Sequence, residues 1–170
     1  MRAHQFIVES ETTQYNVSSP NEIAPEILQQ LSQLIATGSE VDMSMVSRNL
    51  ANANSIGYAI DNGKPVGVIV LKNPVSSYRQ KVFQNAGVPE LQQTYQLELG
   101  YVYVEPEYRG MVSARLLRLM NRSITAPIFA TTRENNTTIN KILQFGGYQL
   151  TGEPFASDRG TYKILLWIKG

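Results

Sequence analysis

The stretch from residue 101 to residue 114, YVYVEPEYRGMVSA, joins a predicted strand to a predicted helix through a short turn. Such a turn directs several free backbone N–H groups and the positive end of the helix dipole toward one place. This arrangement is typical of a site for an anion such as a phosphate. The stretch has neither the lysine of a P-loop nor the Gly-x-Gly-x-x-Gly spacing of dinucleotide-binding proteins. The alternative is an ordinary strand-to-helix loop without a ligand.

Two residue types that often carry catalysis are nearly absent. The 170 residues include no cysteine and a single histidine, His4. The lack of thiols excludes a cysteinyl acyl-enzyme, disulfides, and zinc or iron–sulfur sites built on cysteine. One histidine near the start of the chain also argues against a Ser-His-Asp triad or a histidine-rich metal site. We therefore expect no metal.

The charge balance points away from polyanionic partners. Fifteen lysines and arginines oppose 14 aspartates and glutamates, which leaves a net charge of +1. We therefore expect no binding to nucleic acid or to a membrane surface. The longest apolar run, VGVIVL at 66–71, is too short to span a bilayer, and the first ten residues lack the apolar core of a signal peptide. The expected location is the cytoplasm.

Two motifs, in this order, resemble the GNAT superfamily of acyl-CoA-dependent N-acyltransferases. Val104-Glu105-Pro106-Glu107-Tyr108-Arg109-Gly110 is similar to that superfamily's V-x-P-x-[YF]-[RQ]-G turn. Asn136, followed after ten residues by Gly147-Tyr148, is similar to its N-(x)10-G-[FY] pattern. The resemblance covers residues 55–169. It implies a mixed central β-sheet flanked by helices, and transfer of an acetyl group from acetyl-CoA to an amine.

The resemblance also implies where the coenzyme binds. Its pyrophosphate would meet the turn and the start of the helix, at Arg109, Gly110, Met111, Val112, Ser113 and Ala114. Its pantetheine arm would pair with the backbone of Val102, Tyr103 and Val104 like an added strand, and Asn136 belongs to the same predicted site. A bulge at this strand end, with a splay toward the strand at 127–132, would open the cleft for the thioester. A free backbone N–H there would stabilise the oxyanion.

The sequence departs from the family pattern at two places. Val112 and Ala114 stand where the family's loop usually has glycines. Valine disfavours a positive φ, so the loop either has ordinary dihedral angles or is aligned one residue differently. Leu143 stands where many members have a tyrosine that protonates the leaving thiolate. A thiol pKa near 8.5 makes the thiolate a tolerable leaving group without that acid.

Catalytic candidates lie on the strand before the turn. Glu98 resembles a frequent position of the family's base, which would take a proton from the acceptor amine. Tyr101 and Tyr103, expected on the opposite face of the strand, are alternatives, and Tyr103 is included among the predicted catalytic residues. The ordinary readings are a solvent-facing carboxylate and two core aromatics.

The remaining pattern predicts the elements that position these residues. A cap at Ser19 precedes a helix ended by Gly38, and a cap at 39–42 precedes another helix over 43–50. Asn62-Gly63 is a turn between strands at 55–60 and 65–72, the second apolar on both faces and so central. Other strands are expected at 5–9, 97–104, 127–132, 148–155 and 161–169, and helices after the turn at 106–110 and from the cap at 135–137 to Gly146-Gly147. We expect one α/β domain over residues 1–170.

A long connection from residue 74 to residue 95 holds a short helical stretch at 78–86. Connections of this length are usually functional lids or disordered segments. We expect a lid over the acceptor, with Tyr78, Arg79 and Phe83 as substrate-binding residues. A disordered insertion is the alternative.

Three readings of function remain. The first is an acetyltransferase in which the amine attacks acetyl-CoA directly in a ternary complex. The second is a protein that binds acyl-CoA but has lost the chemistry, and the third is a small assembly protein without a ligand. The acceptor is a small-molecule or peptide amine of unknown identity, and the protein is a monomer or a homodimer.

Overall fold

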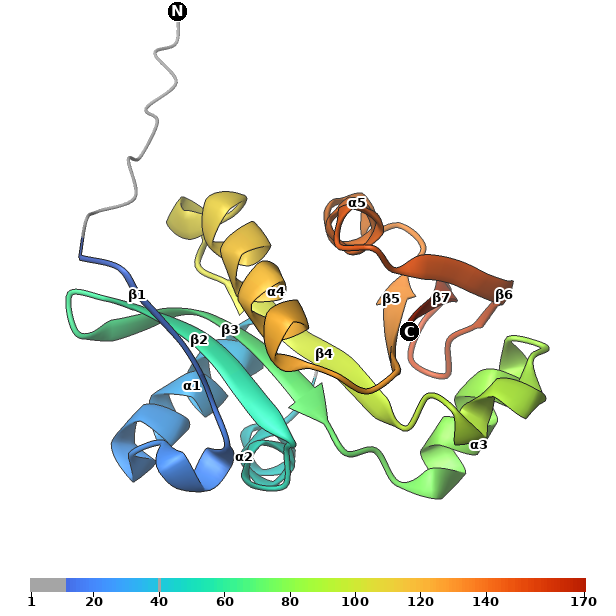
Figure 1. Ribbon diagram of the computed structural model, residues 1–170, viewed down its shortest axis with the longest axis horizontal. Helices are drawn as coiled ribbons and strands as arrows, with labels where there is room; N and C mark the ends of the chain where they lie inside the picture. Colours follow the sequence, from blue (N-terminus) through green and yellow to red (C-terminus); the bar gives the residue numbers. More distant parts are fainter. Residues whose placement is uncertain (1–11, 40) are drawn as a thin grey trace, which may run out of the picture.

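A seven-stranded sheet organises the computed structural model, which describes residues 12–39 and 41–170 (Figure 1). The strands lie in the order β1-β2-β3-β4-β5-β7-β6, and helices cover both faces. The predicted α/β architecture with a mixed sheet is therefore confirmed. The edge strand β1 (Gln14–Ser18) is not predicted by the sequence pattern. The strand expected at 5–9 and His4 lie outside the described residues.

A tight hairpin forms the first half of the sheet. β2 (Ser55–Asp61) and β3 (Lys64–Lys72) pair antiparallel through Asn62 and Gly63, whose φ angles are 49° and 76°. Positive φ at both central residues is the geometry that Asn-Gly favours. β3 lies between β2 and β4, and its residues 66–71 are buried. Its predicted central position is confirmed.

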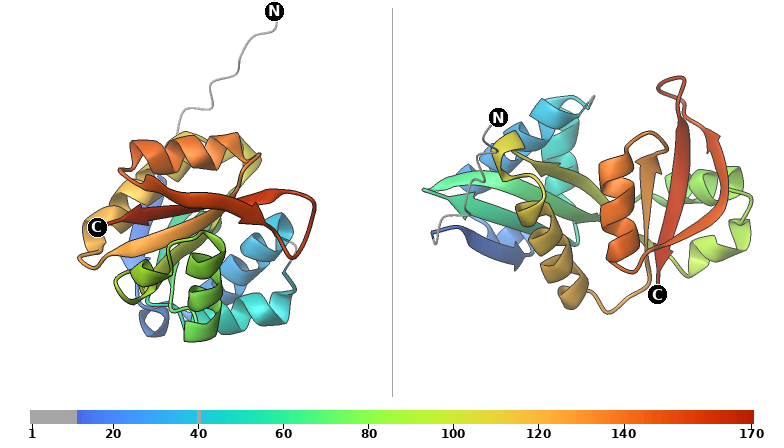
Figure 2. Two further views of the ribbon diagram at one scale, coloured as in Figure 1. Left: turned by 90° about the vertical axis from the view of Figure 1, so that its right-hand side faces the viewer. Right: turned by 90° about the horizontal axis from the view of Figure 1, so that it is seen from above.

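Two helices, α1 (Pro25–Gly38) and α2 (Met43–Ala51), cover one face of this half of the sheet (Figure 2). The capping box at Ser19 is present, but it starts a short 3-10 turn, η1 (Pro20–Glu22), before α1 begins. The cap of α2 is Asp42, not Ser39, because the Asp42 carboxylate accepts hydrogen bonds from two backbone N–H groups of the first turn. Those bonds, and a stronger one from the Ser44 hydroxyl, hold the pKa of Asp42 below its usual range.

The opposite face carries α4 (Met111–Ser123) and α5 (Thr137–Phe145) (Figure 2). Leu116, Leu117 and Met120 of α4 are buried against the sheet. α5 begins at the Asn136 cap and is followed by Gly147, whose φ is 87°, as predicted. In the described ranges, no helix is long and apolar enough to cross a membrane.

β4 (Leu97–Val104) and β5 (Ile128–Arg133) divide the sheet into two halves. They pair in parallel only where residues 97–99 meet residues 128–130, and then diverge (Figure 1). The second half consists of β5, β7 (Lys163–Lys169) and β6 (Gln149–Ala156). α3 (Ser76–Asn85) and the 3-10 turn η2 (Pro89–Gln93) cover the face of this half opposite α5. The predicted splay is therefore present.

Candidate functional site

A bulge in β4 lies where the two strands diverge. Val70 opposes Gly100 and Val68 opposes Tyr103, so two residues of β4 share the single residue Ile69. Tyr101, inside the bulge, has a φ of 46°, which non-glycine residues rarely adopt. An extra residue in one strand reverses the alternation of side chains beyond it.

The reversal corrects one prediction about faces. Tyr101 and Tyr103 pack with the cluster beneath α1 and α2, whereas Leu99 and Val104 pack with the cluster on the α4 face. Tyr101 therefore lines the same cavity as Glu98, although strict alternation predicted opposite faces. The bulge was expected at 102–104 and lies one residue earlier.

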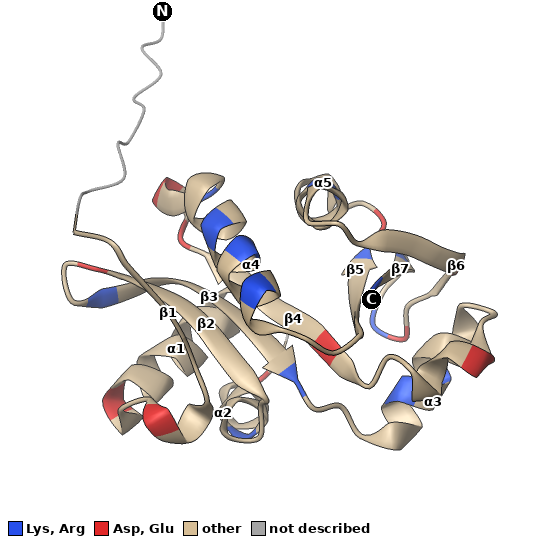
Figure 3. Ribbon diagram, viewed as in Figure 1, with Lys and Arg blue, Asp and Glu red and all other residues tan. Residues whose placement is uncertain are grey.

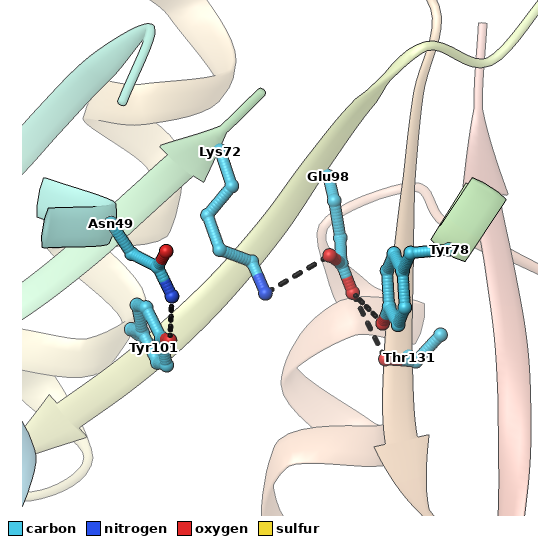
Figure 4. Close-up of polar contacts among 6 residues, drawn as sticks. All are labelled: Asn49, Lys72, Tyr78, Glu98, Tyr101 and Thr131. Atoms are coloured by element: carbon cyan, nitrogen blue, oxygen red, sulfur yellow. Dashed lines mark hydrogen bonds and ion pairs between the residues drawn. The ribbon is translucent and has the colours of Figure 1, made fainter. Parts of the chain in front are cut away.

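Glu98 is the centre of a polar cluster built from three strands and α3 (Figure 4). Its side chain is 2% exposed, so the alternative of a solvent-facing carboxylate is wrong. Its Oε1 accepts hydrogen bonds from the Tyr78 hydroxyl at 2.9 Å and the Thr131 hydroxyl at 3.1 Å. Lys72 Nζ lies 2.9 Å from Oε2. A buried carboxylate is tolerated here because a cation and two donors surround it.

The cluster continues toward α2. Lys72 Nζ lies 4.8 Å from the centre of the Tyr101 ring, and the Tyr101 hydroxyl accepts a hydrogen bond from Asn49 Nδ2 at 2.7 Å. At the other end, burial and the charge of Glu98 raise the pKa of Tyr78, so its phenol stays protonated and donates to Glu98. The contacts thus form one chain from α2 to α3 across the divergence of the strands.

A cavity of about 1140 Å³ opens beside this cluster, on the face covered by α1, α2 and α3. The ends of these helices and the loop between β6 and β7 form its walls. Besides the cluster, its lining includes polar residues from distant parts of the chain: Asn52, Asn73, Asn136, Asp158 and Arg159. A cavity of this size accepts a small molecule next to Glu98.

Tyr103, in contrast, is not among the described residues that line the cavity beside Glu98. Its ring packs so closely on Gly38 that a β-carbon there would lie 2.0 Å from the ring. The Arg109 guanidinium lies 5.9 Å from the centre of the Tyr103 ring. Of the two candidate tyrosines, the structure brings Tyr101 to Glu98 and places Tyr103 in a packing position.

The predicted anion site is the start of α4. Gly110 has φ 97° and ψ −80°, and no side chain caps the helix. The N–H groups of Met111, Val112 and Ser113 therefore have no partner within the helix. The side chains of Val112 and Ser113 are buried, and Val112 packs beside Gly67. The loop thus takes its positive φ at Gly110, and Val112 has an ordinary φ.

The side chains near this loop do not all face it. Arg109 Nε donates to the carbonyl of Val104 at 3.1 Å, which holds the guanidinium against the end of β4. Asn136 caps α5 by accepting from the N–H of Ile139 at 3.3 Å and lines the cavity next to Glu98. At the α4 side of the divergence, the groups left to contact a ligand are therefore the backbone of residues 110–113 and of residues 102–104.

The connection from 74 to 95 is part of the wall. Phe83 is fully buried, with its ring centre 5.1 Å from that of Phe129. Arg79 has a buried Nε without a hydrogen-bond partner among the described residues. Only Tyr78 of the three predicted substrate residues lines the cavity. Five residues turn a helix by about 140°, so Tyr78 and Phe83 face different ways, and the prediction for Phe83 is corrected to a core residue.

A second groove, of about 560 Å³, runs between α4 and α5 on the opposite face of the sheet. Arg118, Arg122, Phe145 and Lys169 contribute to it, and positively charged bands lie along α4 (Figure 3). Beneath α5, Leu143 is buried in the core. The sequence pattern does not predict this groove, because its walls come from separate segments of the chain.

No family model matches the sequence, and no curated protein matches it. Solved structures match in fold. An acetyltransferase of the GNAT family from Bacillus cereus is 14% identical, with a TM-score of 0.62, and the match covers 92% of this chain and 96% of that one. This chain has the GNAT fold.

Two further structures with the GNAT fold are similar. An acyl-CoA N-acyltransferase from Pseudomonas aeruginosa is 12% identical, with a TM-score of 0.66, over 93% of this chain and 99% of that one. An aminoglycoside 6′-N-acetyltransferase complexed with coenzyme A is 14% identical, with a TM-score of 0.65, over 91% and 96%. At these identities the GNAT fold is shared, and the chemistry has to be argued from the site.

Proposed function

We propose that the protein is an acetyl-CoA-dependent N-acetyltransferase of the GNAT superfamily, in which an acceptor amine attacks directly in a ternary complex. One observation carries the proposal: β4 and β5 part immediately beyond Leu99 and Ala130. A buried carboxylate, Glu98, stands at that point on one face, and an uncapped helix start at Gly110 stands beyond it. The divergence thus connects a cavity for the amine with a site for an anionic donor.

The α4 side suits coenzyme A. When bound, acetyl-CoA supplies the acetyl group as an activated thioester. The free N–H groups at the start of α4 would hold its pyrophosphate, because a β-carbon at Gly110 would meet nothing within 4 Å and the approach is open. The backbone of 102–104 would pair with the pantetheine arm. Arg118 and Arg122, which line the groove beside α5, would contact the remaining phosphate.

The α1–α3 side suits the acceptor amine. Its ammonium loses a proton to Glu98, and Oε2 is the oxygen that receives it, because Oε1 already accepts two hydrogen bonds. Lys72 Nζ lies 2.9 Å from Oε2 and occupies the place that the amine takes when it arrives. The Tyr101 ring, 4.8 Å from Nζ, gives Lys72 a second binding place when the amine displaces it.

No side chain is proposed as the acid for the leaving thiolate. Leu143 occupies the family's tyrosine position and is buried. The hydroxyl of Tyr148 donates to Asn121 at 2.9 Å, and burial raises the pKa of Tyr148. A thiolate with a conjugate acid of pKa near 8.5 leaves without such help at neutral pH.

The proposal is tested by thiol release from acetyl-CoA with a panel of amines. Glu98→Gln should lower kcat by about 100-fold while leaving the Kd of acetyl-CoA unchanged. The deficit should shrink at high pH, where more of the amine is already neutral. Glu153→Gln, an exposed carboxylate on β6, is the matched control and should behave as the unaltered protein does. Equal loss at every pH would point to a structural role for Glu98.

A protein that binds acyl-CoA without transfer is the second candidate, and Leu143 is the observation that favours it. It predicts that acetyl-CoA raises the melting temperature by mass action while no amine releases thiol. Calorimetry and the thiol assay, run together, separate the two candidates.

A further inference from the structure

The side chain of Lys72 reaches from the end of β3 to the carboxylate of Glu98 (Figure 4). Its Nζ lies 2.9 Å from Oε2, and Oε2 is buried and accepts no hydrogen bond from the described residues. Oε1, in contrast, is held by the hydroxyls of Tyr78 and Thr131. Nζ is therefore a primary amine beside the very oxygen that is proposed to take a proton from the acceptor amine.

Lys72 also lies against the backbone where β4 leaves β5. Leu99 is the last residue of β4 that pairs with β5, and Gly100 follows it. A β-carbon on Gly100 would lie 2.7 Å from Lys72 Cε and 3.0 Å from Nζ. The lysine thus lies over the first residue beyond the pairing, and the glycine leaves room for it. The thioester is proposed to bind at this divergence, so Nζ lies on the path by which an amine would reach it.

A second lysine of the cavity lining, Lys81, lacks this setting. Its ammonium pairs with Asp158, and the two side chains are 57% and 72% exposed, so water surrounds the pair. The side chains of Lys72 and Glu98 are 22% and 2% exposed. A base must lie within hydrogen-bond reach of the amine whose proton it takes. Of these two lysines, only Lys72 combines a buried base with a place at the divergence.

We infer that Lys72 is a site of self-acetylation: without an acceptor amine, its Nζ takes the acetyl group of acetyl-CoA. This inference rests on the proposed acetyltransferase function and adds a modification of the enzyme's own chain. The Lys72 ammonium gives one proton to Glu98 Oε2, and Nζ forms a bond to the thioester carbonyl carbon as the carbon–sulfur bond breaks. A second proton of Nζ passes to the leaving sulfur. The products are N-acetyl-lysine, the coenzyme A thiol and one proton, which Glu98 releases.

Acetylation at this position would stop transfer to other amines. The acetyl group removes the charge of the lysine, so Glu98 would lose the cation beside Oε2. The same group would fill the place that an acceptor amine takes. An amine that binds first displaces Nζ and protects it. The modification would therefore act as a brake that engages when acetyl-CoA is abundant and the amine is scarce.

The test incubates the protein with acetyl-CoA in an amine-free buffer and follows each lysine by peptide mass spectrometry. Lys72 should gain an acetyl group at least about tenfold faster than Lys64, on the exposed hairpin turn, or Lys81, because its Nζ is held at the reacting centre. The rate at Lys72 should saturate with acetyl-CoA and should not depend on the concentration of the protein. Equal rates at the three lysines would overturn the inference, because they would indicate uncatalysed acetylation from solution.

Two variants connect the modification to the site. Glu98→Gln should slow acetylation of Lys72 by about 100-fold, whereas Glu153→Gln, on the exposed side of β6, should not change it. Thermal unfolding establishes that each variant is folded. Gly100→Ala is the alternative if Glu98→Gln does not fold, because its β-carbon displaces Nζ while both reacting side chains remain. An unchanged rate at Lys72 in the folded variant would overturn the inference.

The outcomes separate this inference from the proposed function. Thiol release with an added amine, but no acetyl group at Lys72 in its absence, would overturn the inference and leave the acetyltransferase function intact. Acetylation of Lys72 without transfer to any amine would support the inference and overturn the proposed function. If neither reaction occurs, both are overturned.

Discussion

Replacing Lys72 by methionine would leave the Glu98 carboxylate without its cation. The Glu98 side chain is 2% exposed and that of Lys72 is 22% exposed, so the pair is largely out of water. Removing one partner of a buried pair costs about 3–5 kcal/mol. Because Tyr78 and Thr131 still donate to Oε1, we expect the lower end, about 3 kcal/mol. For a chain of this length that is a fall in Tm of about 6–12 °C.

A double-mutant cycle isolates the pair. Urea unfolding of Lys72→Met, Glu98→Gln and the double variant should give a coupling of about 2 kcal/mol, since the double variant leaves no buried charge. Lys81 and Asp158 supply the matched control, because their side chains are 57% and 72% exposed. Their coupling should be below about 1 kcal/mol.

The comparison decides whether the site is built as described. A coupling at Lys72 and Glu98 no larger than that at Lys81 and Asp158 would refute the reasoning, because it would mean that water screens both pairs alike. The positioning of Glu98 by Lys72 would then have no energetic basis.

Three further predictions concern stability and the coenzyme. Burial raises the pKa of Tyr78 and Tyr148, so the folded protein keeps protons that the unfolded chain loses above about pH 10. The free energy of unfolding should therefore fall as pH rises past that value. In Tyr148→Phe, urea unfolding should show a fall that is smaller by about 1.4 kcal/mol per pH unit. Gly110→Ala forces a side chain into φ 97° and should weaken acetyl-CoA binding, whereas Gly63→Ala at φ 76° should cost stability alone, by calorimetry and thermal unfolding. Phe83→Ala should lower the free energy of unfolding by about 3–5 kcal/mol, and a loss below 1 kcal/mol would place that ring outside the core.

The parts of the fold that were predicted correctly depend on local signals. The turn at Asn62-Gly63 follows from two residues that tolerate positive φ. Asn136 and Gly147 bound α5 because one accepts from a free N–H and the other ends the helix in the left-handed region. The strand at 97–104 has its predicted limits. Each of these signals acts within a few residues, so it can be recognised from the sequence alone.

The parts that were missed depend on contacts between distant segments. The bulge gives Tyr101 a positive φ, which a tyrosine in the sequence does not predict. Tyr101 and Glu98 were therefore expected on opposite faces of the strand. The burial of Glu98 depends on Lys72, Tyr78 and Thr131, which come from three other elements. No spacing within one segment predicts such a set, because the sheet order brings them together.

The geometry also explains why the motifs point to a superfamily but not to an acceptor. The first motif forms the turn before α4, at the proposed coenzyme side, and the second bounds α5, which begins at Asn136 in the lining of the cavity beside Glu98 and ends beside the groove next to α4. The proposed acceptor cavity is lined by residues of α1, α2, α3 and the loop between β6 and β7, among others, and Asn136 is the one residue of the two motifs among its described lining residues. Because the two sites meet only where β4 and β5 diverge, the acceptor side can change its charge without disturbing the helix start that suits the coenzyme. Acceptor preference is therefore to be sought in the lining of the proposed acceptor cavity, because the 12–14% identity to other proteins of the same fold reflects the fold alone.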